Sequence, residues 1–144
     1  MLKLFTRDGI AFQYPGNWSL ETEEDDGGWT ASISSPGTAF FVVSLRPDNQ
    51  TPAQVVDEAL DAMKAEYKEL EAEPVVESVG GFPAVGHNID FLTLDTAINA
   101  WSRCTGLTEG NLLIFAQVSE LDRRLYDQVL RAMLGSFAIA DGDV

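Results

Sequence analysis

The chain contains one histidine, His87, and one cysteine, Cys104, so a site built on imidazole or thiol chemistry would have to use them. Neither lies in a motif that activates a nucleophile, and no serine stands in a G-x-S-x-G elbow. Cys104 lies among Ser102, Arg103 and Thr105 in what the sequence predicts to be the middle of a strand, and not at a helix N-terminus that would lower its pKa. We therefore expect both residues to be structural and the protein not to be an enzyme.

The sequence predicts no metal site and no cofactor. A single histidine and a single cysteine cannot complete the tetrahedron of a structural zinc site. The acidic run over 21–26 lacks the spaced oxygen ligands of a calcium loop, and we interpret it as a solvated hairpin tip. Gly27-Gly28 and Gly80-Gly81 precede predicted strands rather than helices, unlike phosphate-binding loops. With 23 acidic residues, an active site built on carboxylates stays open as an alternative.

The tryptophans are the candidates for binding. Trp18, Trp29 and Trp101 could line a groove or pack within a sheet. Trp101 is the most interesting, because Asn99, Trp101 and Arg103 alternate along a predicted strand and share a face that mixes aromatic and polar character, as binding surfaces do. We predict binding roles for Trp29, Asn99, Trp101 and Arg103, with the two tryptophans flanking a groove.

These residues must be positioned by strands and two helices. The first fifty residues alternate between apolar and polar types and are interrupted by turn signals, which predicts an antiparallel meander of strands at 3–6, 10–14, 20–23, 29–34 and 39–46. Apolar residues then recur every three or four positions, which predicts a helix over 52–71 with Thr51 as N-cap and Pro74 as its stop.

The second half repeats this order of strands followed by a helix. Strands are predicted at 75–79, 85–91, 96–104 and 112–118, and an amphipathic helix follows Ser119 and ends at Gly135. The order predicts an α+β fold in which a mostly antiparallel β-sheet is flanked by helices. The 144 residues suit a single domain spanning 1–144, and 45% hydrophobic residues suffice for a core without disulfides.

Charge narrows the choice of partner. The formal net charge of −14 repels polyphosphates and anionic lipid surfaces, so we expect no nucleic acid and no membrane as partner. No segment has the length and apolarity of a secretory leader or a membrane span, which predicts a cytoplasmic protein.

Short motifs along nearly the whole chain resemble those of the PsbP-like superfamily. The segment 10–18, with Phe12, Tyr14, Pro15 and Trp18, is similar to the F-x-Y-P-x-x-W opening of these proteins. Further similar motifs are Ser34-Ser35-Pro36, Gly81-Phe82-Pro83-Ala84 and, after the last helix, Gly135-Ser136-Phe137.

The resemblance implies a central antiparallel sheet between helices and a scaffold that mostly binds proteins. Relatives include photosystem II extrinsic subunits, a nuclear-import factor that binds the Ran GTPase, DcrB-like lipoproteins and chaperones that load type VI secretion effectors. The sequence lacks the leader and the lipoprotein cysteine of some branches, which makes a cytoplasmic adaptor or secretion chaperone the nearer implication. The resemblance supplies no catalytic residues.

Our leading hypothesis is a non-enzymatic domain that binds another protein through an exposed sheet face or a groove. The alternative is a carrier of a small molecule or lipid, with an apolar cavity under the C-terminal helix. Its lining would comprise Phe91, Leu94, Trp101, Phe115 and Met133. An unpaired edge strand could also form a homodimer.

Overall fold

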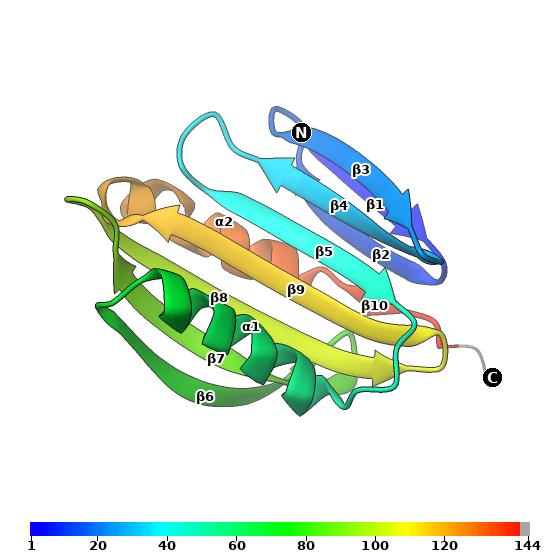
Figure 1. The fold of residues 1–144 in the computed structure, drawn as a ribbon. Coiled ribbons are helices and arrows are strands. Elements are labelled where there is room, and N and C mark those ends of the chain that lie inside the picture. Colours follow the sequence, from blue (N-terminus) through cyan, green and yellow to red (C-terminus); the bar gives the residue numbers. More distant parts are fainter. Residues whose placement is uncertain (142–144) are drawn as a thin grey trace.

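The computed structural model describes residues 1–141, which form a seven-stranded antiparallel sheet with a helix on one face and a mixed layer on the other (Figure 1). The sheet has the order β3-β4-β5-β9-β8-β7-β6. Its strands are β3 (Ser19–Asp25), β4 (Gly28–Ser34), β5 (Phe40–Arg46), β6 (Leu70–Val79), β7 (Phe82–Leu92), β8 (Ala97–Leu107) and β9 (Gly110–Ser119).

The other elements form the two outer layers. Helix α1 (Pro52–Glu66) lies on one face, over β7, β8 and the margin of β9. The opposite face carries helix α2 (Arg123–Gly135), the 3₁₀ turn η1 (Glu120–Asp122) that precedes it, and a small sheet of β1 (Leu2–Arg7), β2 (Ile10–Pro15) and β10 (Ala138–Ile139). The prediction of an α+β fold with a mostly antiparallel sheet flanked by helices is confirmed.

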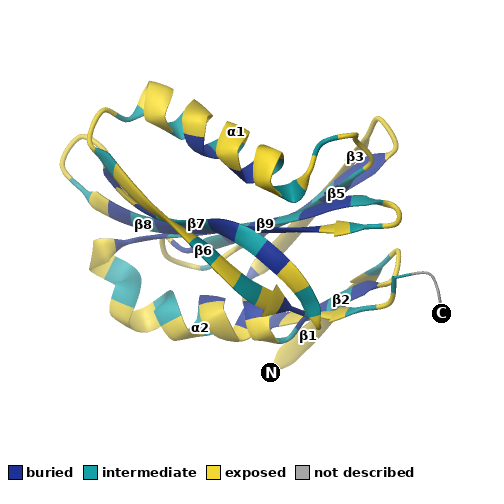
Figure 2. Cartoon of the chain, turned by 90° about the horizontal axis from the view of Figure 1, so that it is seen from below, coloured by how far each residue is buried: buried dark blue, intermediate teal, exposed yellow. Residues whose placement is uncertain are grey.

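Each layer contributes one apolar core (Figure 2). The larger core lies between the large sheet and the small sheet with α2, and its centre is a set of stacked or tilted aromatic rings that includes Phe12, Phe41 and Phe137. The smaller core lies under α1, around Leu60, Ile89 and Phe91. Burial on both faces explains why the central strands read as nearly continuous apolar runs.

The prediction that the first five strands form one meander is wrong. β1 and β2 pair with each other in the small sheet, and β3 begins a separate hairpin in the large sheet. The alternating residues Ile10, Phe12 and Tyr14 are buried against the large sheet, so β2 lies across it as a second layer instead of extending it.

Helix α1 begins as predicted but ends five residues early. Thr51 and Gln54 form a complete capping box, and Pro52 occupies the first helical turn. The helix ends at Glu66 because β6 begins at Leu70, whereas the prediction placed the helix end at residue 71. The apolar period continues past the true end because Tyr67 and Leu70 still pack on the core under α1.

β3 and β6 are the two edge strands of the large sheet, and each pairs with a neighbouring strand on one side only within residues 1–141. Pro74 lies within β6, and an edge strand tolerates proline because its missing N–H need not join a ladder. The homodimer stays a prediction.

Within residues 1–141, no helix combines the length and the apolarity that crossing a membrane would need.

Candidate functional site

Three of the four predicted binding residues meet on one face of the sheet. Asn99, Trp101 and Arg103 alternate along β8 and point toward the side that carries α2. The antiparallel register places Asp90 of β7 opposite Asn99, and Asn88 opposite Trp101. A predicted face of mixed aromatic and polar character is therefore present, extended by the neighbouring strands.

These residues form the floor of a groove with a volume of about 410 Å³, which we call the β6–β8 groove. One wall is the outer strand β6 and the other is the exposed side of α2. The full lining comprises Glu73, Val75, Glu77, Asn88, Asp90, Asn99, Ala100, Trp101, Arg103, Arg123, Asp127 and Arg131. Most of these side chains are charged or carry amides, so the groove favours a polar ligand over a lipid chain.

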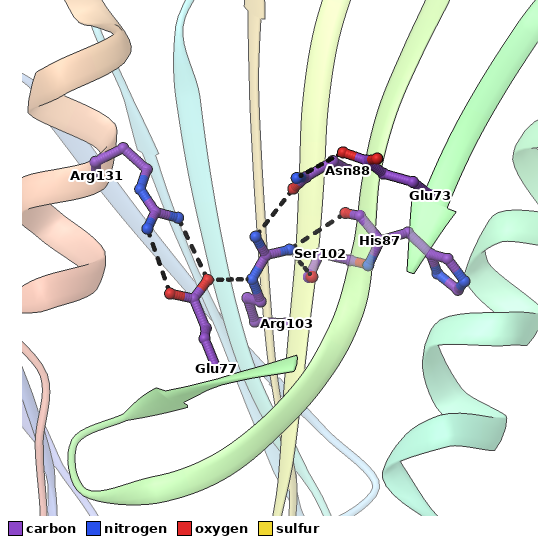
Figure 3. Close-up of polar contacts among 7 residues, drawn as sticks. All are labelled: Glu73, Glu77, His87, Asn88, Ser102, Arg103 and Arg131. Carbon is purple, nitrogen blue, oxygen red and sulfur yellow. Dashed lines mark hydrogen bonds and ion pairs between the residues drawn. The ribbon is translucent and has the colours of Figure 1, made fainter. Parts of the chain in front are cut away.

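Arg103 is the centre of a polar network at the floor of the groove (Figure 3). Its side chain is only 2% exposed, yet its guanidinium donates to the Glu77 carboxylate, to the Asn88 side-chain oxygen at 2.9 Å, and to the Ser102 backbone carbonyl at 2.7 Å. A longer contact of 3.3 Å reaches the carbonyl of His87. A buried guanidinium is tolerated only when it is paired in this way, so the network is held rigidly.

Glu77 joins the sheet to α2. Its carboxylate accepts hydrogen bonds from Arg103 and, at 3.3 Å for each oxygen, from Arg131. Both guanidinium groups also lie against Trp101, with carbon-to-ring-centre distances of 5.4 Å for Arg103 and 5.8 Å for Arg131. The Trp101 ring therefore makes cation–π contacts with two arginines of the protein itself.

The pKa of Glu77 reflects competing effects. Burial raises the pKa of this carboxyl, but hydrogen bonds and positive charge from Arg103 and Arg131 outweigh burial and hold it below its usual value. The carboxylate is therefore ionised at neutral pH and links the two cations.

Trp29 does not flank this groove, and the expectation that it would is wrong. Its side chain is 2% exposed, packs against Phe5 in the larger core, and donates its indole N–H to the Asp8 carboxylate at 2.9 Å. The small sheet of β1 and β2 covers it, which sequence periodicity could not reveal because that sheet forms a separate layer.

His87 and Cys104 lie on the opposite face, under α1. Figure 3 shows the His87 ring pointing away from Arg103, and its Nε2 lies 3.6 Å from Oδ1 of Asp57 on α1. Its Nδ1 is buried and has no hydrogen-bond partner within residues 1–141. For Cys104, burial and the nearby charge of Asp48 raise the pKa to about 12, which keeps the thiol protonated at neutral pH.

Cys104 should therefore be inert toward alkylation in the folded protein. At pH 8 its thiolate fraction is roughly 1,000-fold lower than that of a free cysteine, and burial adds a further barrier. Mass spectrometry after iodoacetamide treatment should show no labelling of the native protein and full labelling in denaturant. Native labelling at the rate of the unfolded control would show that the thiol is accessible and ionised.

The five residues proposed to line a carrier cavity do not surround one space. Phe91 and Phe115 pack in the core under α1, whereas Trp101 and Met133 belong to the core under α2. Leu94 lies fully exposed in the loop after β7. The sheet itself separates the two pairs, because neighbouring residues along a strand point to opposite faces.

Across the described part of the chain, residues 1–141, no group of three or more His, Cys, Asp or Glu side chains could hold a metal ion. The sequence prediction missed Glu77 and Arg131, which complete the network around Arg103. Alternation along 73–77 places Glu77 on the same strand face as Glu73, but only packing shows that α2 brings Arg131 above it.

With this geometry in hand, comparison with known proteins establishes the fold. No protein-family model matches the sequence, and a sequence search among curated proteins gives no match. Solved structures that superpose on nearly the whole chain include several of the PsbP-like fold, and the chain has this fold, as its motifs predicted.

Three of these structures are informative. LpqN from Mycobacterium tuberculosis, involved in cell envelope biogenesis, aligns with a TM-score of 0.59 and 12% identity over 97% of this chain and 91% of its own. The cyanobacterial PsbP protein CyanoP from Synechocystis aligns with a TM-score of 0.57 and 16% identity over 96% and 92%. The T6SS immunity protein TplEi from Pseudomonas aeruginosa aligns with a TM-score of 0.57 and 14% identity over 92% of this chain and 49% of its own.

Proposed function

We propose that this protein is a non-enzymatic adaptor or chaperone-like domain that binds another protein through the β6–β8 groove. The observation that carries the proposal is the set of fixed polar groups in this groove. The buried Arg103 holds the side chains of Glu77 and Asn88, and Asp90 holds the half-buried Asn99. A rigid floor reduces the entropy lost on binding, which is how small interfaces gain affinity.

The chemistry of the groove favours a polypeptide segment over a lipid. Its rim carries the carboxylates of Glu73, Asp90 and Asp127, which would meet the backbone amides or cationic side chains of a partner. These carboxylates would repel an anionic headgroup, and the exposed arginines of the lining, Arg123 and Arg131, are already paired with Glu120 and Glu77. Structures of the same fold include LpqN, involved in cell envelope biogenesis, and the immunity protein TplEi, and neither is described as an enzyme. The cytoplasmic location stays a prediction.

Filling the groove should abolish partner binding without unfolding the protein. Asn99 is half-buried in the groove, and within residues 1–141 its side chain bonds only to Asp90, so Asn99→Trp would project an indole into the space that a partner needs. A tagged wild-type protein expressed in its native host should retain a stoichiometric protein partner, identified by mass spectrometry. The variant should bind the purified partner at least about tenfold more weakly in calorimetry.

Asn17→Trp is the matched control, because Asn17 is exposed in a turn outside the groove. It should bind the partner as the wild type does. If both variants bind the partner with wild-type affinity, the groove is not the binding site. If no protein is retained in stoichiometric amount, protein binding itself is contradicted.

A further inference from the structure

The large sheet has a second surface that no element of the described chain covers. On the side of α1, the helix packs over β7, β8 and the margin of β9, and the rest of that face is bare. Figure 1 shows β3, β4 and β5 without a helix in front of them, and Figure 2 shows the same half of the sheet beside α1 with nothing over it. We call this surface the β3–β9 face.

Apolar side chains lie along the centre of the β3–β9 face. Cross-strand pairing puts Val42 of β5 beside Phe115 of β9 and, on the other side, beside Ser32 of β4. Phe40 is half-buried, and its ring centre lies 6.1 Å from that of Phe115, which packs at the margin of the core under α1. Leu113 of β9 continues the stripe, also half-buried. Half-buried aromatic and aliphatic groups on a sheet face are typical of a surface that packs against another element.

The flank of α1 that borders this face carries one valine and two alanines, followed by Glu66 in the last turn. Asp57 points toward β7, because its carboxylate contacts His87. Helical spacing then places Val55, Ala59 and Ala62 on the opposite flank, above the open half of the sheet. Small side chains let a second helix approach α1 closely, at the roughly 8–10 Å that packed helices need.

The charges around the face are almost all negative. Glu21 and Glu23 of β3 are exposed on the same side and form its outer border. Arg46 is the basic residue at the end of this border, and its guanidinium is already occupied by Asp25 and by the Thr30 hydroxyl at 2.9 Å. With a net charge of −14 for the whole chain, the border attracts cations.

We propose that the β3–β9 face binds a basic amphipathic helix of a partner protein, which lies beside α1 and completes the helical layer. The apolar side of the helix would cover Phe40, Val42 and Leu113, and its Lys or Arg residues would reach Glu21 and Glu23. A second copy of this chain does not fit, because its own negative charge would meet this border. An added strand would pair at the free edge of β3 and would not cover the face, because β4, β5 and β9 are paired on both sides.

This inference goes beyond the function proposed for the β6–β8 groove, because it concerns the opposite face of the sheet. Together the two surfaces would let one domain hold two polypeptides at once. The binding role proposed for one surface can be disproved without affecting the role proposed for the other.

The test uses a synthetic peptide of about 18 residues, roughly five helical turns, with Leu on one side and Lys on the other. Its twin replaces every Lys with Glu, and a third peptide replaces them with Gln. Amide chemical-shift changes in NMR should map the Lys peptide to β4, β5, β9 and the Val55–Ala62 flank. The Lys peptide should bind at least about tenfold more tightly than the Glu twin at low salt, and more tightly than the Gln peptide.

Two matched double variants separate the faces. Glu21→Lys with Glu23→Lys reverses two exposed charges on the β3–β9 face, and Glu71→Lys with Glu73→Lys reverses two exposed charges on β6, at the wall of the β6–β8 groove. The Glu21 and Glu23 variant should bind the Lys peptide about tenfold more weakly than the wild type. The Glu71 and Glu73 variant should bind it with an affinity within about twofold of the wild type. Val42→Asp, checked for folding by circular dichroism, should also abolish binding.

Three results would overturn the proposal. The first is a shift map confined to the β6–β8 groove with loss of binding in the Glu71 and Glu73 pair, which would assign the peptide to the groove. The second is equal affinity for all three peptides. The third is wild-type affinity in a folded Val42→Asp variant.

Discussion

Replacing Gly86 with alanine should destabilise the protein by about 4 kcal/mol or more, a large fraction of the stability of an ordinary domain. A Cβ atom at this position would lie 1.7 Å from the backbone oxygen of Ser102 and 2.6 Å from its carbonyl carbon. These atoms belong to β8, so only separation of β7 from β8 would relieve the clash. The same Ser102 oxygen accepts a hydrogen bond from Arg103, which ties this close approach to the network below the groove.

Urea unfolding followed by tryptophan fluorescence would measure the effect, with Gly135→Ala as the matched control. Gly135 ends α2, and a Cβ there would meet nothing within 4 Å. Alanine at that position should leave stability unchanged or raise it by about 0.5–1 kcal/mol through its better helix propensity. A stability of Gly86→Ala within about 1 kcal/mol of the wild type would contradict the steric argument.

Replacing Arg103 with alanine should cost about 3 kcal/mol, the second largest effect that we expect. The guanidinium is 2% exposed and is the buried cation for Glu77, so its removal leaves that carboxylate and the Asn88 side chain short of donors. Glu77 keeps Arg131 and is 25% exposed, which places the cost at the lower end for a broken buried pair. Arg103→Met should be nearly as costly, because it restores volume but no donors.

Arg131→Ala is the matched comparison, because this arginine is 49% exposed and pairs with the same carboxylate. Exposed pairs contribute little, so its cost should stay below about 1 kcal/mol. If both alanine variants lose the same unfolding free energy, the contribution of each arginine does not depend on its burial.

Acid should reveal the same interaction. The pKa of Glu77 is lower in the folded protein than its ordinary value, so its ionised form stabilises the fold above the unfolded pKa of about 4.3. This contribution is lost as the pH falls below that value and through the lower folded pKa. The difference in unfolding free energy between wild type and Arg103→Ala should therefore narrow below about pH 4, and a constant difference would contradict the assignment.

The strands of the β6–β8 half were predictable, and so was the face that Asn99, Trp101 and Arg103 share. Alternation is a local property of an extended chain, so three residues spaced by two must point the same way wherever the strand lies. The start of β6 was not predictable, because Tyr67 and Leu70 continue the apolar period of α1 while already outside the helix. The sequence predicts Pro74 to be a helix stop, but Pro74 lies inside the edge strand β6.

Arg103 shows where sequence reasoning ends in the site. Its type and parity suggested a surface residue of a binding face, whereas the structure buries it under Glu77 and α2. Trp29 was also expected at the surface of a groove, but β1 and β2 cover it. These two strands form a separate sheet, whereas the prediction placed them in the same sheet as Trp29. Which layer a strand joins depends on contacts between segments far apart in the chain.

By itself, the sequence determined the α+β class, the antiparallel strands, the start of α1 and the acidic charge, because these follow from periodicity, caps, turns and charge within short windows. The second helix was predicted to follow Ser119, but the 3₁₀ turn η1 comes first and α2 begins at Arg123. Only the tertiary structure decided that α1 covers one half of its face and leaves the other bare, and that α2 closes the β6–β8 groove with Arg131. The burial of a side chain and its partners across the sheet depend on residues that are far apart in the sequence, so a short stretch of sequence does not reveal them.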